Sequence, residues 1–265
     1  RRQLGNQLAH AFHPRRMSVM PLPVAPADSP VVELRRYRLH PGRRDALIDL
    51  FERELLAPQE ALGMQVLGPF RDLDDPDRFV WLRAFPRMDM RAAALDAFYR
   101  GPVWQRHRGD ANATMIDWDD VHLLRPAWPD AGLERFVAGA TPAAPTALLA
   151  VTVCRLGVMP GAGELRFFAQ RLVPALAAIG GRPFACLAGD PRDNAFPALP
   201  VHDDRRVLAW CTWFADAAAH GRHLQALARH ADIGDALRSV LAAPPEVMRL
   251  APTTAATGRG GRRMR

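Results

Sequence analysis

The residues best suited to chemistry alternate along one short stretch of the chain. Glu33, Arg35 and Tyr37 occupy every second position within Val31–Arg44, VVELRRYRLHPGRR, and alternate side chains of a β-strand share one face. The arginine can hold an anionic oxygen, and the phenol can donate a hydrogen bond or a proton. We therefore predict Tyr37 and Arg35 as catalytic residues and Glu33 as a ligand-binding residue.

A second predicted strand, residues 79–85, adds two candidates. Trp81 and Arg83 share its bulkier face, and both are predicted to bind ligand. If these faces point into an enclosure, they line an apolar pocket with a few polar groups, the usual composition of a small-molecule site. The alternative is that Glu33 forms a structural ion pair with Arg35 or Arg83 and that the aromatic residues are core.

A long connection in the second half carries the last candidate. Residues 189–204 join two predicted strands and contain several prolines and His202, whereas the matching connection in the first half spans only residues 72–77. Long connections in compact domains often serve as lids or binding loops. We predict that this loop covers a site built mainly from the first half and that His202 contacts the ligand.

The hydrophobic pattern that positions these residues occurs twice. In each half a strand, a helix, two strands, a helix and a strand follow one another, the β-α-β-β-α-β order of a ferredoxin-like unit. A Pro-Gly turn follows the first strand of each half, at Pro41 and at Pro160. The sequence therefore predicts an α+β fold with two tandem, divergent copies about 115–120 residues apart.

Each four-stranded sheet has both helices on one side and leaves its other face bare, so we expect the two sheets to face each other as a barrel-like enclosure.

Met17 is the expected natural start of the chain. The expected divisions are a disordered tail at 1–30, the first unit at 31–127, a linker at 128–145, the second unit at 146–252 and a disordered basic tail at 253–265.

The charge lies at the ends of the chain. The net charge is +7, and the two predicted tails account for all of it, with four arginines against one aspartate at the start and four arginines against no acid at the end. A nucleic-acid module carries a basic stripe on its folded body. We therefore expect no nucleic acid to bind the folded body, and no apolar run approaches the roughly 20 residues of a transmembrane helix.

The remaining reactive residue types favour structural roles. Cys154, Cys186 and Cys211 show no metal-ligand spacing, and we expect structural thiols in a reducing cytoplasm. His220 and His223 lie three residues apart on a predicted helix, but no third ligand stands at a fixed offset, so we expect solvated histidines. No glycine loop suited to phosphate is present, and we expect neither a metal nor a cofactor.

Several separated segments resemble the NIPSNAP family, in the family's order, over residues 31–127. They are Glu33–Leu39 with Pro41–Gly42, Phe79–Trp81 with Phe85 and Arg91, Gly101–Pro102 with Trp104, and Val121–Pro126. Residues 146–252 resemble the wider dimeric α+β barrel group only by pattern. Where the family has a tyrosine or another aromatic residue in the first strand, the second copy has Leu156 or Cys154, which predicts a one-sided site.

The resemblance implies a limited range of functions. The wider group includes cofactor-free monooxygenases, isomerases, dehydratases, haem enzymes and proteins without established chemistry. NIPSNAP proteins are mostly described as vesicle- or membrane-associated, as mitochondrial-signalling proteins, or as uncharacterised. Fold alone does not choose among these.

Our leading hypothesis is a protein that binds a small hydrophobic or weakly anionic molecule in a barrel pocket and acts as a cofactor-independent oxygenase or isomerase. The alternative is a non-catalytic interaction protein with a vestigial pocket. Perturbed ionisable groups around a real cavity favour the first reading, and a barrel interior filled with side chains favours the second. Whether the chain is an enzyme, and whether it forms a homodimer through outer surfaces, stays open at this point.

Overall fold

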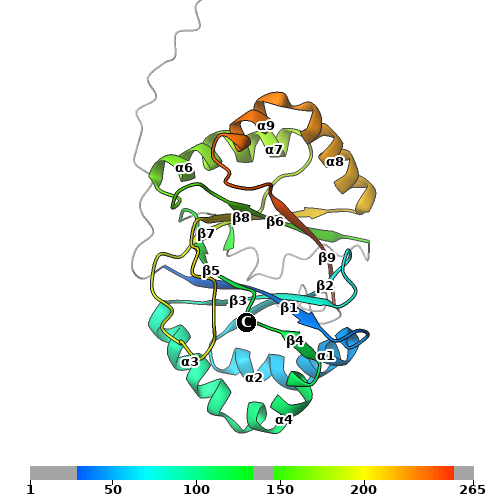
Figure 1. Cartoon of the computed structure of the whole chain (residues 1–265), viewed down its shortest axis with the longest axis vertical. Helices are drawn as coiled ribbons and strands as arrows, with labels where there is room; N and C mark the ends of the chain where they lie inside the picture. The colour runs from blue at the N-terminus through cyan, green and yellow to red at the C-terminus, as the bar shows by residue number, and fades with distance from the viewer. Residues whose placement is uncertain (1–28, 130, 134–145, 254–265) are drawn as a thin grey trace, which may run out of the picture.

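The computed structural model describes residues 29–129, 131–133 and 146–253. Most of the predicted tails and most of the predicted linker therefore lie outside the described residues. Within them, the elements follow the predicted order twice. Figure 1 shows the helices of the first unit on one side of the molecule, the helices of the second unit on the other, and the strands between them.

The first unit begins at the strand that carries the chemical candidates. The region predicted as its last helix and strand contains two helices and two short strands. The elements are β1 (Val31–Leu39), α1 (Arg44–Leu50), the π-helical segment η1 (Phe51–Leu55), α2 (Leu56–Ala61), β2 (Gln65–Asp72), β3 (Arg78–Phe85), α3 (Met88–Arg100), α4 (Pro102–Asn112), β4 (Met115–Asp117) and β5 (Val121–Pro126).

The second unit repeats this order, including a π-helical segment at the matching place. Its last helical region breaks at His230, whose backbone is not helical. The elements are β6 (Leu148–Arg155), α6 (Ala162–Phe167), η2 (Phe168–Leu172), α7 (Val173–Ala178), β7 (Ala185–Gly189), β8 (Val207–Phe214), α8 (Ala217–Arg229), α9 (Ala231–Arg238) and β9 (Glu246–Pro252).

The strands of both units form one closed barrel. Their order among the described residues is β3-β2-β9-β6-β8-β7-β5-β1-β4, and the pairing of β3 with β1 closes the ring. The units meet at two antiparallel seams, β2 with β9 and β5 with β7. This confirms the predicted α+β fold with tandem ferredoxin-like units in a barrel-like arrangement.

Aliphatic side chains fill the interior of the barrel. Val32 and Leu34 of β1 and Leu82 of β3 pack there against residues of the second unit such as Val151 and Met248, all buried. This contact covers the bare sheet faces that the sequence implied. It also means that the expected pocket between the two sheets is not found among the described residues.

The opposite face of each sheet packs against the helices of its own unit. In the first unit this face carries Tyr37, Phe79 and Trp81. In the second unit it carries Cys154 and Trp210, which pack with Phe168 and other helix residues into a filled core. No helix of the described part of the chain is long and apolar enough to cross a membrane.

Candidate functional site

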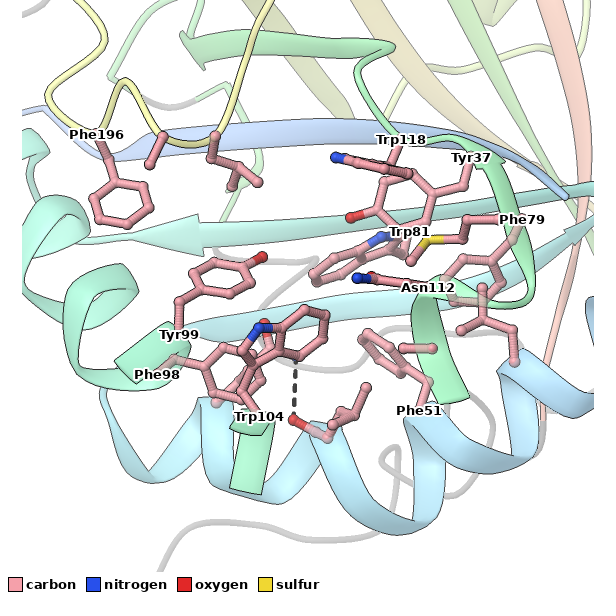
Figure 2. Close-up of a pocket in the computed structure, with 17 residues that line it drawn as sticks. Tyr37, Phe51, Phe79, Trp81, Phe98, Tyr99, Trp104, Asn112, Trp118 and Phe196 are labelled. Carbon is pink, nitrogen blue, oxygen red and sulfur yellow. Dashed lines mark hydrogen bonds between the residues drawn. The ribbon is translucent and has the colours of Figure 1, made fainter. Parts of the chain in front are cut away.

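A cavity of about 280 Å³ lies between the sheet and the helices of the first unit. Figure 2 shows aromatic side chains around it. Both tyrosines of the chain and three of its six tryptophans are among the lining residues, an unusually aromatic wall in a protein with 8% aromatic residues. The aromatic residues of the lining are Tyr37, Phe51, Phe79, Trp81, Phe98, Tyr99, Trp104, Trp118 and Phe196.

The strand register sets the floor of the cavity. Tyr37 lies opposite Phe79, Arg35 opposite Trp81, and Glu33 opposite Arg83 in the antiparallel pair of β1 and β3. Directly paired residues of neighbouring strands point to the same side of the sheet. The predicted site residues of the two strands therefore do come together, but on the helix side of the sheet instead of inside the barrel.

Helices and one loop supply the walls. The π-helical segment contributes Phe51 and Leu55, and α3 and α4 contribute Tyr99 and Trp104 on either side of the break at Gly101. The remaining side is closed by Phe196, Ala198 and Leu199, which belong to the long loop of the second unit. In Figure 1 this loop descends from the sheet of the second unit to α3 of the first.

Two hydrogen-bond donors at the floor have no protein acceptor among the described residues. The Tyr37 hydroxyl accepts a hydrogen bond from Nε of Arg35 at 2.7 Å, which leaves its own proton available. Nε1 of Trp81 is buried and has no partner. In Figure 2 the polar ends of Tyr37, Tyr99 and Asn112 point into the cavity, so an otherwise apolar site offers a few directed polar groups.

Behind this floor lies a fully buried charge network. One carboxylate, Glu33, accepts hydrogen bonds from Arg35 at 2.8 Å, from Arg83 at 2.6 Å and from Arg91 at 2.6 Å. All four side chains have 0% exposure. Burial by itself would raise the pKa of Glu33, but the three guanidinium groups outweigh it and hold that pKa well below its usual range.

The network connects the pocket to the loop of the second unit. Nη1 of Arg91 donates to Oδ1 of Asn194 at 2.9 Å, and Asn194 in turn holds the loop through Nδ2, which donates to the Leu199 carbonyl.

Burial raises the pKa of Tyr37, with Arg35 acting in the opposite direction. A neutral phenol is therefore the form at neutral pH, and it serves as a donor.

The predicted site residues divide into three groups. Tyr37 and Trp81 line the cavity. Arg35 and Arg83 lie just behind the floor, because their guanidinium carbons are 5.7 Å and 5.1 Å from the centre of the Trp81 ring. Glu33 binds both, so the structural ion pair that we held as the alternative is present next to the pocket. His202 is not among the cavity residues.

His202 lies in a separate polar cluster at one end of the barrel. Its Nε2 is 2.8 Å from Oδ1 of Asp120, and Nη2 of Arg36 is 2.7 Å from the same oxygen and 3.4 Å from Nε2 of His122. Asp120, His122 and His202 could together hold a metal ion. A cation would have to compete with Arg36 for that carboxylate oxygen, so the cluster is better explained as an anchor of the loop.

The electrostatics of this cluster support the anchor. Although burial opposes it, hydrogen bonding from His202 and the charge of Arg36 lower the pKa of Asp120 to about 2, which keeps this carboxylate ionised. Burial, reinforced by the charges of Arg36 and His202, lowers the pKa of His122 to about 3. His122 is therefore a neutral acceptor beside the Arg36 guanidinium.

Other sequence expectations are corrected or supported here. His220 and His223 are buried against Phe214 and are not solvated. The three cysteines are buried and free. Burial raises the pKa of Cys154 and of Cys186 to about 12, so these thiols are protonated and suited to packing.

Sequence reasoning missed the contributions of the second half of the first unit and of Asn194 in the loop. Tyr99, Trp104 and Asn112 line the cavity, and Asn194 joins the buried network. The available signal was the pair of aromatic residues on either side of Gly101-Pro102. No pattern signalled Asn194, because its partner Arg91 lies more than 100 positions away in the sequence.

Comparison with known proteins agrees with this architecture. The NIPSNAP family model matches residues 32–128, and no curated protein matches the chain. A proposed monooxygenase from Fusobacterium nucleatum superposes over 84% of this chain and 92% of its own, with a TM-score of 0.55 and 10% identity. A second, from Lactobacillus acidophilus, covers 84% of this chain and 93% of its own, with a TM-score of 0.52 and 12% identity.

A NIPSNAP family protein of unknown function from Agrobacterium tumefaciens is 21% identical over 38% of this chain and 92% of its own, with a TM-score of 0.36. At 10–12% identity the two larger structures share the fold, and they extend over both units. The family model extends over the first unit, which carries the cavity and the charge network. The NIPSNAP family model thus matches the first of two units of a dimeric-α+β-barrel type of fold, the unit that contains the cavity.

Proposed function

We propose that the first unit binds a flat, largely apolar small molecule in the aromatic cavity and acts on it as a cofactor-independent oxygenase or isomerase. The observation that carries this proposal is the arrangement of Tyr37. Its hydroxyl lies in the cavity wall, accepts a hydrogen bond from the buried Arg35, and has a proton available for a ligand. An enclosed apolar site with a few directed donors is the usual form of a small-molecule site.

The chemistry follows from where charge would develop. Isomerisation next to a carbonyl, and direct reaction of an organic molecule with oxygen, both proceed from an electron-rich enolate or phenolate of the substrate, which would form by loss of the substrate's acidic proton to water before it enters the cavity. Tyr37 would stabilise the oxygen of that species by a hydrogen bond or by proton transfer. Arg35 would then stabilise the negative charge that remains on the phenol oxygen, because its Nε already donates to that atom at 2.7 Å.

The rest of the lining would position the substrate. Trp81 on the floor and Trp104 on the wall offer ring faces and edges to a flat molecule. Phe196 of the loop stacks with Tyr99 at a ring separation of 6.1 Å. The loop would therefore help to exclude water, so that donors at the floor act in a medium of low dielectric constant.

The alternative, a non-catalytic interaction protein with a vestigial pocket, draws support from one specific observation. The barrel interior and the helix side of the second unit are filled with side chains. That observation applies to the space between the sheets and to the second unit. It does not apply to the cavity of the first unit, which is why we place the function there.

The test is native mass spectrometry of the freshly purified full chain, followed by ligand titration. We expect a retained small molecule, and we expect its binding to change tryptophan fluorescence because three tryptophans line the cavity. Tyr37→Phe should weaken binding about three- to tenfold, the worth of one hydrogen bond.

The matched control is Thr152→Ala in the second unit, which should leave binding unchanged. Absence of any bound small molecule, together with equal affinities of the wild type and Tyr37→Phe for compounds from a library of flat aromatic molecules, would contradict the proposal. Turnover of the retained molecule in the presence of oxygen, or its conversion to an isomer, would separate catalysis from binding alone.

A further inference from the structure

We infer that the cavity of the first unit takes an organic anion: a flat aromatic acid whose charged group accepts a hydrogen bond from Tyr37 in front of the buried arginines. This inference rests on the proposed function, since it assigns the chemical class of the molecule bound at the same site. It is carried by a count of buried charges and by the position of the unpartnered donors.

The buried network behind the cavity floor has an excess of positive charge. Arg35, Arg83 and Arg91 contribute three positive charges, and Glu33 contributes one negative charge, with all four side chains at 0% exposure. No other carboxylate of the described residues forms an ion pair with these arginines. The excess of two charges is therefore held without a protein counter-ion, a state that proteins generally avoid.

The arginines also have unused hydrogen-bonding capacity. Nη2 of Arg35, of Arg83 and of Arg91 is buried and has no partner in the part of the chain that the structure describes. Buried donors of native proteins are nearly always satisfied. An ionised Tyr37 would supply a compensating charge, but burial raises the pKa of that phenol, so the neutral form persists and the excess remains.

The excess charge lies close enough to the cavity to act on a ligand. The guanidinium carbon of Arg35 is 5.4 Å from the centre of the Tyr37 ring, and that of Arg83 is 5.1 Å from the centre of the Trp81 ring. Both rings line the cavity. An oxygen that accepts from the Tyr37 hydroxyl therefore lies next to the phenol oxygen to which Nε of Arg35 donates at 2.7 Å.

The shape of the wall fixes the rest of the molecule. The cavity walls away from the floor are formed mainly by aromatic and aliphatic side chains, including Phe51, Phe98 and Trp104. Such walls favour a flat apolar body. A flat body with one anionic group at the floor therefore satisfies both parts of the site, whereas a polyanion would leave charge against apolar walls.

The test compares two probes of nearly equal size, 2-naphthoate and the neutral 2-naphthamide, titrated into the full chain at neutral pH with tryptophan fluorescence as the readout. We expect the acid to bind at least about tenfold more tightly than the amide. Arg83→Met, which lowers the buried excess by one charge, should reduce this ratio at least about threefold.

Arg155→Met is the matched control, because it removes one positive charge from a side chain of the second unit that is 59% exposed. It should leave the ratio of the two affinities unchanged. Equal affinities of the wild type for acid and amide would overturn the anion inference and leave the proposed pocket standing, whereas failure of both probes to bind would overturn both. If Arg83→Met does not fold, the ratio of the wild type's affinities for acid and amide still decides whether the cavity prefers an anion.

Discussion

The two units of this chain have the same elements but fill the space between sheet and helices differently. When the Pro-Gly turns after β1 and β6 are aligned, Glu33 corresponds to Thr152, Arg35 to Cys154 and Tyr37 to Leu156. In the neighbouring strand, Arg83 lies opposite Glu33, whereas Trp210 lies opposite Thr152. A carboxylate with three arginines in one unit thus corresponds to thiol, hydroxyl and apolar groups in the other.

This difference shows what the fold itself requires. The second unit closes its core with apolar side chains around Phe168 and Trp210, so the architecture needs no buried charge. Buried ionic groups are costly to desolvate and seldom stabilise a protein more than apolar packing would. The network of the first unit is therefore best explained by the cavity that it borders.

The π-helical segments sharpen the same point. Such segments often occur at functional sites, yet both units have one, at Phe51–Leu55 and at Phe168–Leu172. In the first unit its residues line the cavity, and in the second they are part of a filled core. The segment belongs to the scaffold, and the side chains around it decide whether a site forms.

The largest expected effect concerns the one carboxylate of the buried network. Glu33→Gln removes the counter-charge of three fully buried arginines and is expected to lower the free energy of unfolding by about 3–5 kcal/mol. Thr152→Ala, at the corresponding place in the second unit, should cost about 1 kcal/mol or less. Urea unfolding followed by circular dichroism measures both, and similar losses would break the comparison between the units.

The first residues of the two π-helical segments provide the next test. Phe168→Ala removes a ring from a filled core and should cost about 3–5 kcal/mol. Phe51→Ala removes a ring that borders a cavity, where fewer atoms pack against it, and should cost less. Thermal unfolding of both variants gives the order, and a larger loss for Phe51→Ala would indicate that the cavity is not present in solution.

A pH profile tests the anchor that ties the second unit's loop to the barrel. Because burial lowers the pKa of His122 from 6.5 to about 3, the unfolded chain binds a proton in this range that the folded chain does not. Stability should therefore fall as the pH drops from about 6.5 toward 3, with a slope from this group of at most about 1.4 kcal/mol per pH unit.

His122→Gln should remove the part of the slope that comes from His122. His40→Gln is the control: it changes an exposed histidine and should leave the slope as in the wild type. Urea unfolding between pH 4 and pH 7 measures the difference, since Asp120 stays ionised in this range with its pKa of about 2. Identical profiles for the wild type and His122→Gln would show that His122 does not stay neutral in the folded protein.

The smallest expected effect concerns release of the ligand. Phe196→Ala shortens the side chain that the second unit stacks on Tyr99, so a bound molecule should dissociate several-fold faster without a measurable change in unfolding. Stopped-flow fluorescence measures the rate. Unchanged release would mean that the loop covers the cavity without limiting escape.

The sequence allowed most of the architecture to be predicted, because apolar periodicity and the Pro-Gly turns mark the strands and helices of both units. The face assignment of β1 failed for a physical reason. Eight of its nine residues, including Val32, Glu33 and Arg36, are buried and only Arg38 is exposed, so both faces of the strand are covered. Alternation then separates two sets of side chains without indicating which set faces the helices.

The residues that bind to the candidate residues could also not be predicted from the sequence. Arg91 belongs to a helix pattern, and only the packing of α3 against β1 brings it to Glu33. His202 was expected at the ligand and instead pairs with Asp120, since the loop has its anchor at one end and its apolar residues over the cavity. Length and proline content indicate a loop, but they do not indicate which of its side chains reaches a site.

The two seams that join the units into one ring have a consequence for how this protein can change over generations. In a barrel built from two identical subunits, every substitution occurs twice and must suit both halves. Here the pairing of β2 with β9 and of β5 with β7 joins halves encoded separately in one gene. One half is free to keep charges and a cavity, while the other lengthens a loop to cover them, and neither change is imposed on the opposite side.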